Sequence, residues 1–150
     1  MTDEKPIGFR IADFRIEQFA TVPGVTREGD DFALEIETTF FTLAEKKILG
    51  NRMEIRFTED DQPFVLLTLE SSFAIQPDTW SNLLTEDQQA YRIPLELARH
   101  LSVISVGTAR GVLLAKLRDK PNPYAAYVLP TVDLTQILKE DVVIGVEETV

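Results

Sequence analysis

Residues 94–115 decide the fold, and they read PLELARHLSVISVGTARGVLLA. Pro94 suits the first turn of a helix, and apolar side chains then recur at steps of three and four residues. One apolar stripe passes through Leu97 and Leu101, and a second stripe runs beside it. A helix that is apolar over this much of its circumference is buried on more than one side. We therefore predict a long helix that packs on a sheet and also on a second helix or another subunit.

The same stretch has the length of a membrane span, but it contains Glu96, Arg99 and Arg110. Central charges cost roughly 2.5–3.5 kcal/mol each on insertion scales, so we predict a buried helix and no membrane insertion. Residues 1–5 lack the pattern of a secretory signal. The absence of cysteine excludes disulfides and thiolate chemistry and fits a cytoplasmic location.

Four segments upstream of the helix alternate between apolar and polar residues: 7–22, 31–41, 52–59 and 64–76. Such alternation is typical of half-buried strands, so we expect a sheet that is covered on one side only. Connections between these segments are short, and strands that follow each other usually pair. We predict a four-stranded antiparallel meander in an α+β domain.

The first of these segments changes its alternation midway. Phe9 and Ile11 share one parity, whereas Phe14 and Ile16 share the other. A strand with such a switch usually carries a bulge or a bend. Residues 23–24, Pro-Gly, then predict a turn.

Downstream of this sheet, residues 77–92 are predicted to form an irregular loop that carries apolar anchors. Residues 115–128 form another predicted loop. Asp133 is a plausible N-cap for a short helix over 134–140, which we expect on the same face of the sheet as the long helix. Residues 141–150 show no clear period and are predicted to fray as a tail.

Gly107 and Gly111 lie one turn apart in the long helix, where each costs about 1 kcal/mol of helix propensity relative to alanine. Two interpretations stay open. The glycines allow another backbone to approach closely, as in a subunit contact, or the helix ends near Gly111.

Length and charge limit the classes of function. The 150 residues suit one domain, with a core over about 7–140. There are 15 basic and 25 acidic residues, a net charge of −10. A surface of that sign repels phosphate backbones, and the short basic cluster over 116–120 is ordinary solvated charge, so we predict no nucleic-acid binding.

No residue pattern points to catalysis. His100 is the only histidine, no second metal ligand lies at a diagnostic spacing, and Ser102 and Ser105 do not share its helix face. Residues 107–111 lack the pattern of a phosphate-binding loop. Glu35 and Glu37 lie on the polar face of a strand, where solubility explains them. We predict no enzyme, no metal and no cofactor.

Three segments together resemble the SecB family of export chaperones. They are Ser-Phe-Ala-Ile at 72–75, Arg-Gly at 110–111 and Leu-Pro-Thr-Val-Asp-Leu at 129–134. In that family a four-stranded antiparallel sheet precedes a long helix that ends in Arg-Gly, and a Leu-x-Pro-Val-Asn-Phe-like segment leads into a second helix. The resemblance covers about residues 7–140, and the linker after Arg-Gly is longer here.

The resemblance implies a holdase that binds unfolded apolar polypeptide without ATP and assembles into dimers or tetramers. The tail lacks the dense acidic end that such chaperones use toward SecA, so the resemblance does not extend to that contact and leaves it doubtful for this chain. Candidate client-binding residues are Phe40, Phe41, Trp80, Leu83, Leu84, Tyr124 and Tyr127. Candidate residues of an oligomer interface are Leu101, Ile104, Gly107, Thr108 and Gly111.

Simple core packing explains each client-binding candidate equally well. Two other functions also remain open at this point. One is a chaperone dedicated to a single partner, such as an unstable antitoxin. The other is a small-molecule binding domain or enzyme with a pocket under residues 77–92.

Overall fold

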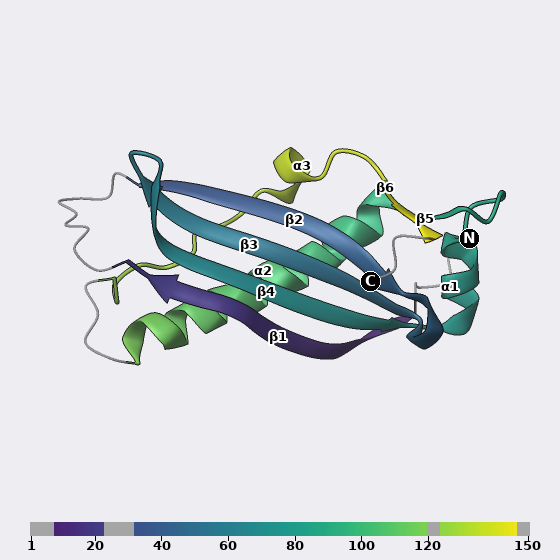
Figure 1. Cartoon of the computed structure of the whole chain (residues 1–150), viewed down its shortest axis with the longest axis horizontal. Coiled ribbons are helices and arrows are strands. Elements are labelled where there is room, and N and C mark those ends of the chain that lie inside the picture. Colours follow the sequence, from purple (N-terminus) through teal and green to yellow (C-terminus); the bar gives the residue numbers. More distant parts are fainter. Residues whose placement is uncertain (1–7, 23–31, 120–123, 147–150) are drawn as a thin grey trace, which may run out of the picture.

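One long helix lies across one face of a four-stranded sheet in the computed structural model, which describes residues 8–22, 32–119 and 124–146 (Figure 1). The sheet contains β1 (Phe9–Thr21), β2 (Ala33–Leu43), β3 (Ile48–Glu59) and β4 (Gln62–Ile75). The helices are α1 (Pro77–Leu83), α2 (Leu95–Arg118), α3 (Leu134–Ile137) and the 3-10 turn η1 (Ala44–Lys46). A second sheet pairs β5 (Ala90–Ile93) with β6 (Val142–Gly145). The predicted α+β class is confirmed.

The strand order is β1-β4-β3-β2, so the predicted meander is wrong. Strands β2, β3 and β4 follow one another through hairpins, but β1 pairs with β4 at the far side, which is a Greek-key arrangement. The two edge strands lie three strand spacings apart, about 14 Å. Residues 22–32 connect them, a chain length that reaches about 35 Å when extended. Short connections favour pairing of strands that follow each other in sequence. This connection is long enough to cross the sheet, so β1 does not have to pair with β2.

Strand β1 carries two β-bulges, which confirms the predicted break in its alternation. Its register against β4 shifts between Ile11 and Asp13 and again between Ile16 and Gln18. Because of each extra residue, the apolar side chains that follow it in β1 again point to the helix side of the sheet. The apolar residues opposite the buried row of β4 are Phe9, Ile11, Phe14, Ile16 and Phe19.

The buried apolar side chains form two clusters between the sheet and α2. The main cluster contains Met53, Ile55, Phe57, Phe64, Val65, Leu67, Leu69, Val106, Ala109, Leu113, Leu117, Tyr124, Leu129 and Leu134. The α1 cluster contains Leu49, Phe73, Ile75, Trp80, Leu83, Tyr91, Ile93, Leu97, Ala98, Leu101, Leu138 and Ile144. Both clusters lie on the helix side of the sheet, as the one-sided alternation of the strands predicts.

A buried polar layer separates the two clusters. Asn51, Ser71, Ser102 and Ser105 are all fully buried, and they fall between the clusters along β3, β4 and α2 alike. The Ser105 hydroxyl donates to the Ser71 hydroxyl over 2.9 Å and so links the helix to the sheet. The Asn51 amide nitrogen donates to the Thr38 hydroxyl over 2.6 Å. Small serine side chains allow the helix backbone to approach the sheet here.

The structure corrects three predictions for the second half of the chain. Residues 77–92 contain helix α1 and strand β5 instead of an irregular loop. Helix α2 continues through Gly111 to Arg118, since Leu113 and Leu117 still bury in the main cluster. Much of the predicted tail forms β6, which pairs with β5 because Ile144 joins the α1 cluster.

The predicted C-terminal helix exists, but it has a single turn. Asp133 caps it, and its carboxylate accepts the backbone N–H of Thr135 over 3.0 Å. Leu134 packs into the main cluster, so α3 lies on the same side of the sheet as α2. The predicted turn at 23–24, loop residues 120–123 and the tail beyond 146 lie outside the described residues.

Candidate functional site

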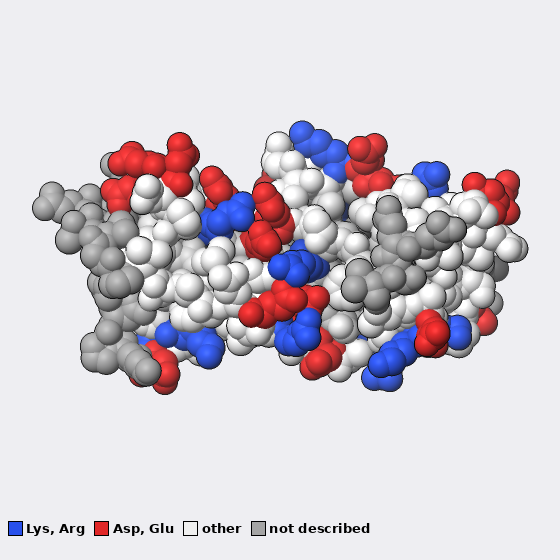
Figure 2. Space-filling view, viewed as in Figure 1, with Lys and Arg blue, Asp and Glu red and all other residues white. Residues whose placement is uncertain are grey.

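The open face of the sheet carries a band of charges. Figure 2 shows acidic and basic side chains alternating across the middle of this face, with uncharged surface on both sides of the band. Three arginines, Arg15, Arg52 and Arg56, form the centre of the band. The carboxylates that pair with them belong to Glu17, Glu35, Glu37, Glu54 and Glu70. Five carboxylates against three guanidinium groups leave this face acidic.

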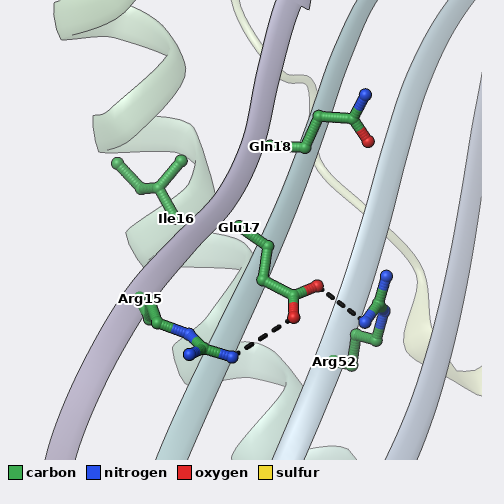
Figure 3. Close-up of a pocket in the computed structure, with 5 residues that line it drawn as sticks. All are labelled: Arg15, Ile16, Glu17, Gln18 and Arg52. Carbon is green, nitrogen blue, oxygen red and sulfur yellow. Dashed lines mark hydrogen bonds and ion pairs between the residues drawn. The ribbon is translucent and has the colours of Figure 1, made fainter.

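At the β1 end of the band, Glu17 bridges two cations. Its carboxylate lies 3.3 Å from Arg15 and 2.6 Å from Arg52, and Ile16 points away from the three (Figure 3). Arg15 also pairs with Glu70, and that hydrogen bond raises the pKa of the Arg15 guanidinium. Arg15, Glu17 and Arg52 line a shallow hollow, and their charged groups therefore satisfy one another.

At the β2 end of the band, the carboxylates outnumber the cations. The Arg56 guanidinium pairs with Glu35 and Glu37 over 3.2 Å each and with Glu54 over 3.1 Å. Hydrogen bonds to Glu35 and then Glu37 raise the pKa of Arg56. The Glu35 and Glu37 side chains are 48% and 64% exposed, so they remain accessible to a further cation.

A mixed hollow, which we call the outer hollow, overlaps this band near the end of β2 and shares Arg15, Glu17, Arg52 and Glu70 with it. It has a volume of about 780 Å³, and its apolar lining includes Phe41 and Leu43. Its charged lining consists of three cations and three carboxylates: Arg15, Lys46, Arg52, Asp13, Glu17 and Glu70. Phe41 lies over Gly50 of β3, where an added Cβ would stand only 2.1 Å from the ring. Glycine at that position is therefore what allows the ring to lie flat on the sheet.

A second hollow, the β2 groove, runs along the other face of the same strand. It measures about 380 Å³, and its lining is Leu34, Ile36, Thr131, Val132, Asp133, Gln136 and Ile137. One wall is β2 and the other is the segment that leads into α3. This second wall is held by Arg110, which donates to the carbonyls of Leu129 and Pro130 over 2.8 Å each.

The wall segment is held again at its far end. The Arg99 guanidinium donates to the carbonyl of Leu138 over 3.0 and 2.7 Å. Two arginines of α2 thus position the segment 129–138 beside β2. The predicted motif residues at 110–111 and 129–134 meet in space through this contact.

A third hollow, of about 760 Å³, opens between α1, β5 and β6 and includes Leu84 in its lining. Two of its polar groups, Thr85 and Asp87, bond to each other. The Asp87 carboxylate accepts from the Thr85 hydroxyl over 2.5 Å and from the Gln89 backbone N–H over 3.0 Å. These contacts lower the pKa of Asp87.

The structure divides the seven client-binding candidates into buried and accessible residues. Trp80, Leu83 and Tyr124 are buried, so in this conformation they belong to the core. Phe40, Phe41, Leu84 and Tyr127 are half-buried. Phe40 and Phe41 line the outer hollow, and Leu83 and Leu84 line the third hollow. Phe40 packs on the α1 cluster, and Tyr127 stacks with Tyr124 and contacts Phe32, Phe57 and Phe64.

The interface candidates are divided in the same way. Leu101 is fully buried against the sheet and cannot contact another subunit in this structure. Ile104 and Thr108 are half-buried. Gly107 and Gly111 lie on the exposed face of α2, with open space around both.

Sequence reasoning missed Leu34, Ile36, Val132 and Ile137, which line the β2 groove. Leu34 and Ile36 have the correct parity for core residues, and nothing in the sequence indicates that α2 leaves them half-covered.

Within residues 8–22, 32–119 and 124–146, no group of three metal-binding side chains is found. No helix in these ranges is both long and apolar enough to span a membrane. His100 packs edge-on against Phe9.

Comparisons with known proteins find similarity among solved structures. No protein-family model and no curated protein matches the chain. Among solved structures, the chain is similar to the Mycobacterium tuberculosis Rv1957 SecB-like chaperone, which was solved in complex with a ChAD peptide from the Rv1956 HigA1 antitoxin. The two are 11% identical with a TM-score of 0.49, and the match covers 83% of this chain and 91% of that chain. Similarity of this degree leaves the function to be argued from this chain's own residues.

Proposed function

We propose that this protein is a chaperone that binds apolar segments of another polypeptide without catalysis, and that it acts in the cytoplasm. The observation that carries the proposal is the pair of hollows with apolar side chains along β2, the outer hollow on one face and the β2 groove on the other. The β2 groove is lined mainly by apolar side chains, and the outer hollow combines Phe40, Phe41 and Leu43 with six charged residues. Such a lining can contact the apolar side chains of an extended polypeptide, since it does not require a specific set of hydrogen-bonding groups in the ligand.

The acidity of the chain supports this role. A net charge of −10 keeps the protein soluble while apolar surface stays open. Exposed apolar side chains outside the two hollows include Ile11, Val103 and Leu114. The sequence resemblance to the SecB family points to the same activity. A general holdase and a chaperone with one dedicated partner both need this surface.

Suppression of aggregation tests the proposal directly. Dithiothreitol-reduced insulin is a suitable client, because a chain without cysteine is unaffected by the reductant. We expect one equivalent of the protein to reduce the light scattering of the insulin B chain at least about twofold. Folded protein that has no effect at a fivefold excess would show that the proposal is wrong.

Matched variants locate the activity. Phe41→Asp with Leu43→Asp changes the outer hollow, and Ile36→Asp changes the β2 groove. Val143→Asp is the control, since Val143 is 55% exposed on β6, away from both hollows. We expect the first two variants to lose suppression and the control to keep it. Far-UV circular dichroism checks that each variant is folded.

A further inference from the structure

The polar layer between the two apolar clusters contains buried side-chain atoms that no protein group satisfies. The Asn51 Oδ1 atom and the Ser102 hydroxyl belong to fully buried residues, and neither has a hydrogen-bond partner among the described residues. A polar group that is buried and unpaired costs more free energy than an ordinary hydrogen bond contributes. Such groups are therefore normally paired with protein or with ordered water.

Asn51 and Ser102 lie around the same contact between sheet and helix. Asn51 is directly opposite Ser71 on the neighbouring strand β4, and Ser71 accepts a hydrogen bond from Ser105 of α2 over 2.9 Å. Ser102 precedes Ser105 by three residues, so it lies on the same face of α2 one turn away. Both unpaired side chains are therefore neighbours of the hydrogen bond that joins β4 to α2.

Ser102 does not use the local partner that a helical hydroxyl often takes. Serine and threonine in helices commonly donate to the backbone carbonyl four residues earlier. The hydroxyls of Ser105 and Thr108 lie 3.3 and 2.9 Å from the carbonyls of Leu101 and Ile104 in this way. The Ser102 hydroxyl makes no such bond within the described part of the chain. It is therefore available for a partner inside the polar layer.

The polar layer also has smaller side chains than the rows of residues beside it. Along β3 and β4, the pair Asn51 and Ser71 stands between the pair Met53 and Leu69 and the pair Leu49 and Phe73. Serine and asparagine fill less volume than these neighbours. A buried water needs such room together with two to four polar groups, and this layer supplies an amide oxygen and several hydroxyls.

We propose that the polar layer binds one buried water molecule, which donates to Asn51 Oδ1 and bonds the hydroxyls of Ser102 and Ser71. Ser71 accepts from Ser105, which leaves its own proton for the water. Water fits this set of groups because it both donates and accepts. A metal ion or an ammonium group does not fit, since no carboxylate in the layer offsets its charge. The water links β3 to α2 at the boundary of the two clusters, and this inference is independent of the proposed chaperone function.

Two variants that each remove one buried hydroxyl test the proposal through the folding equilibrium. We expect Ser102→Ala to lower the folding equilibrium constant about fivefold, the equivalent of one hydrogen bond, although alanine has the higher helix propensity. Thr42→Val is the control. The Thr42 hydroxyl is also buried without a partner in the described residues, but it lies opposite Leu49, outside the polar layer. We expect Thr42→Val to raise the constant, and urea unfolding measures both.

Water-¹⁷O magnetic relaxation dispersion detects the water directly. It responds to water molecules that stay in the protein for longer than the tumbling time, and exchanging hydroxyl protons do not contribute. Ser102→Val fills the site with methyl groups, so we expect the dispersion amplitude to fall by one water relative to the wild-type protein. Thr108→Val is the control, since it makes a similar change on α2 outside the layer and should leave the amplitude unchanged.

Three results would overturn the proposal. They are a Ser102→Ala variant that is more stable than the wild-type protein, equal dispersion amplitudes for the wild-type protein and Ser102→Val, or a crystal structure in which the Ser102 hydroxyl bonds the Ala98 carbonyl. The crystal structure of the wild-type protein decides the case if Ser102→Val does not fold. Density for a water within hydrogen-bond distance of Asn51 Oδ1 and Ser102 Oγ supports the proposal. The insulin experiment tests the chaperone function separately, whichever result is found.

Discussion

The two edge strands of the sheet differ in the regularity of their backbones. β1 has two bulges, at Ile11 to Asp13 and at Ile16 to Gln18, so its outer row of backbone groups is irregular. β2 is regular over Ala33–Leu43. Bulges protect edges against strand pairing, whereas a regular edge invites it. The contrast shows that only β1 is protected within its own backbone, and that β2 is left open beside an apolar groove.

Matched single-residue deletions are expected to give the largest difference between the two strands. Ala12 is the extra residue of the first β1 bulge, so its deletion leaves Phe9, Ile11 and Phe14 on the inward parity. We expect a loss of less than about 1 kcal/mol of unfolding free energy. Deleting Glu37 turns half of β2 over and exposes apolar side chains, which costs about 3 kcal/mol or more. Urea unfolding followed by Trp80 fluorescence measures both, and equal losses would contradict the assignment of the bulge.

Removing the arginine that holds the wall of the β2 groove is expected to have the next largest effect. Arg110→Met loses the two hydrogen bonds to the Leu129 and Pro130 carbonyls. One of them is solvent-exposed, so we expect a total loss of about 2 kcal/mol in urea unfolding. Hydrogen exchange should speed up in 124–137 and not in β1, which has no such wall. Arg118→Met is the control, since it loses one exposed bond to Ala125.

A smaller effect is expected from Gly50→Ala on the open face beside β2. The added methyl group collides with the Phe41 ring, which has to move. Overpacking of this kind costs about 1–2 kcal/mol. In the double variant with Phe41→Ala the collision is absent. The stability loss of the double variant should therefore be smaller than the sum of the losses of the two single variants. Additive losses measured by thermal unfolding would show that the ring does not cover Gly50.

The smallest effect concerns the cap of α3, which forms part of the groove wall. Hydrogen bonds from the Thr135 hydroxyl and backbone N–H lower the pKa of Asp133 below its ordinary value of 3.8. A carboxylate with a lowered pKa in the folded state stabilises the fold at pH values above its ordinary pKa. This stabilisation is lost as the pH falls through the folded-state pKa. Asp133→Ala should therefore flatten the fall in Tm below about pH 4. Glu140→Gln, an exposed charge change nearby, is the control.

Much of the fold could be predicted because burial follows alternation and helical period. The alternation of β2, β3 and β4 is confirmed, and so is the broken alternation of β1. The meander could not be excluded, since both strand orders bury the same residues. The C-terminal end of α2 could not be predicted either. The helix continues beyond Gly111 because Leu117 packs into the main cluster, and that contact depends on the tertiary structure.

The candidate site was harder to predict than the fold. Trp80, Leu83 and Tyr124 have the composition of a binding surface, yet they are core residues. Leu34 and Ile36 have the pattern of core residues, yet they border an open groove. An apolar side chain has the same intrinsic hydrophobicity in either place, and how much of it is buried depends on the tertiary structure, so the sequence carries no signal that separates the two.

The sequence by itself determined which side chains face inward along each strand, the apolar faces of the long helix, and the acidity that keeps open apolar surface soluble. These properties depend on local periodicity and composition alone. Only the tertiary structure decided that β1 crosses to the side of β4 and leaves β2 as an edge. It also decided that Arg110 places 129–137 across from that edge. Such features depend on which distant segments meet, and many pairings satisfy the same local pattern.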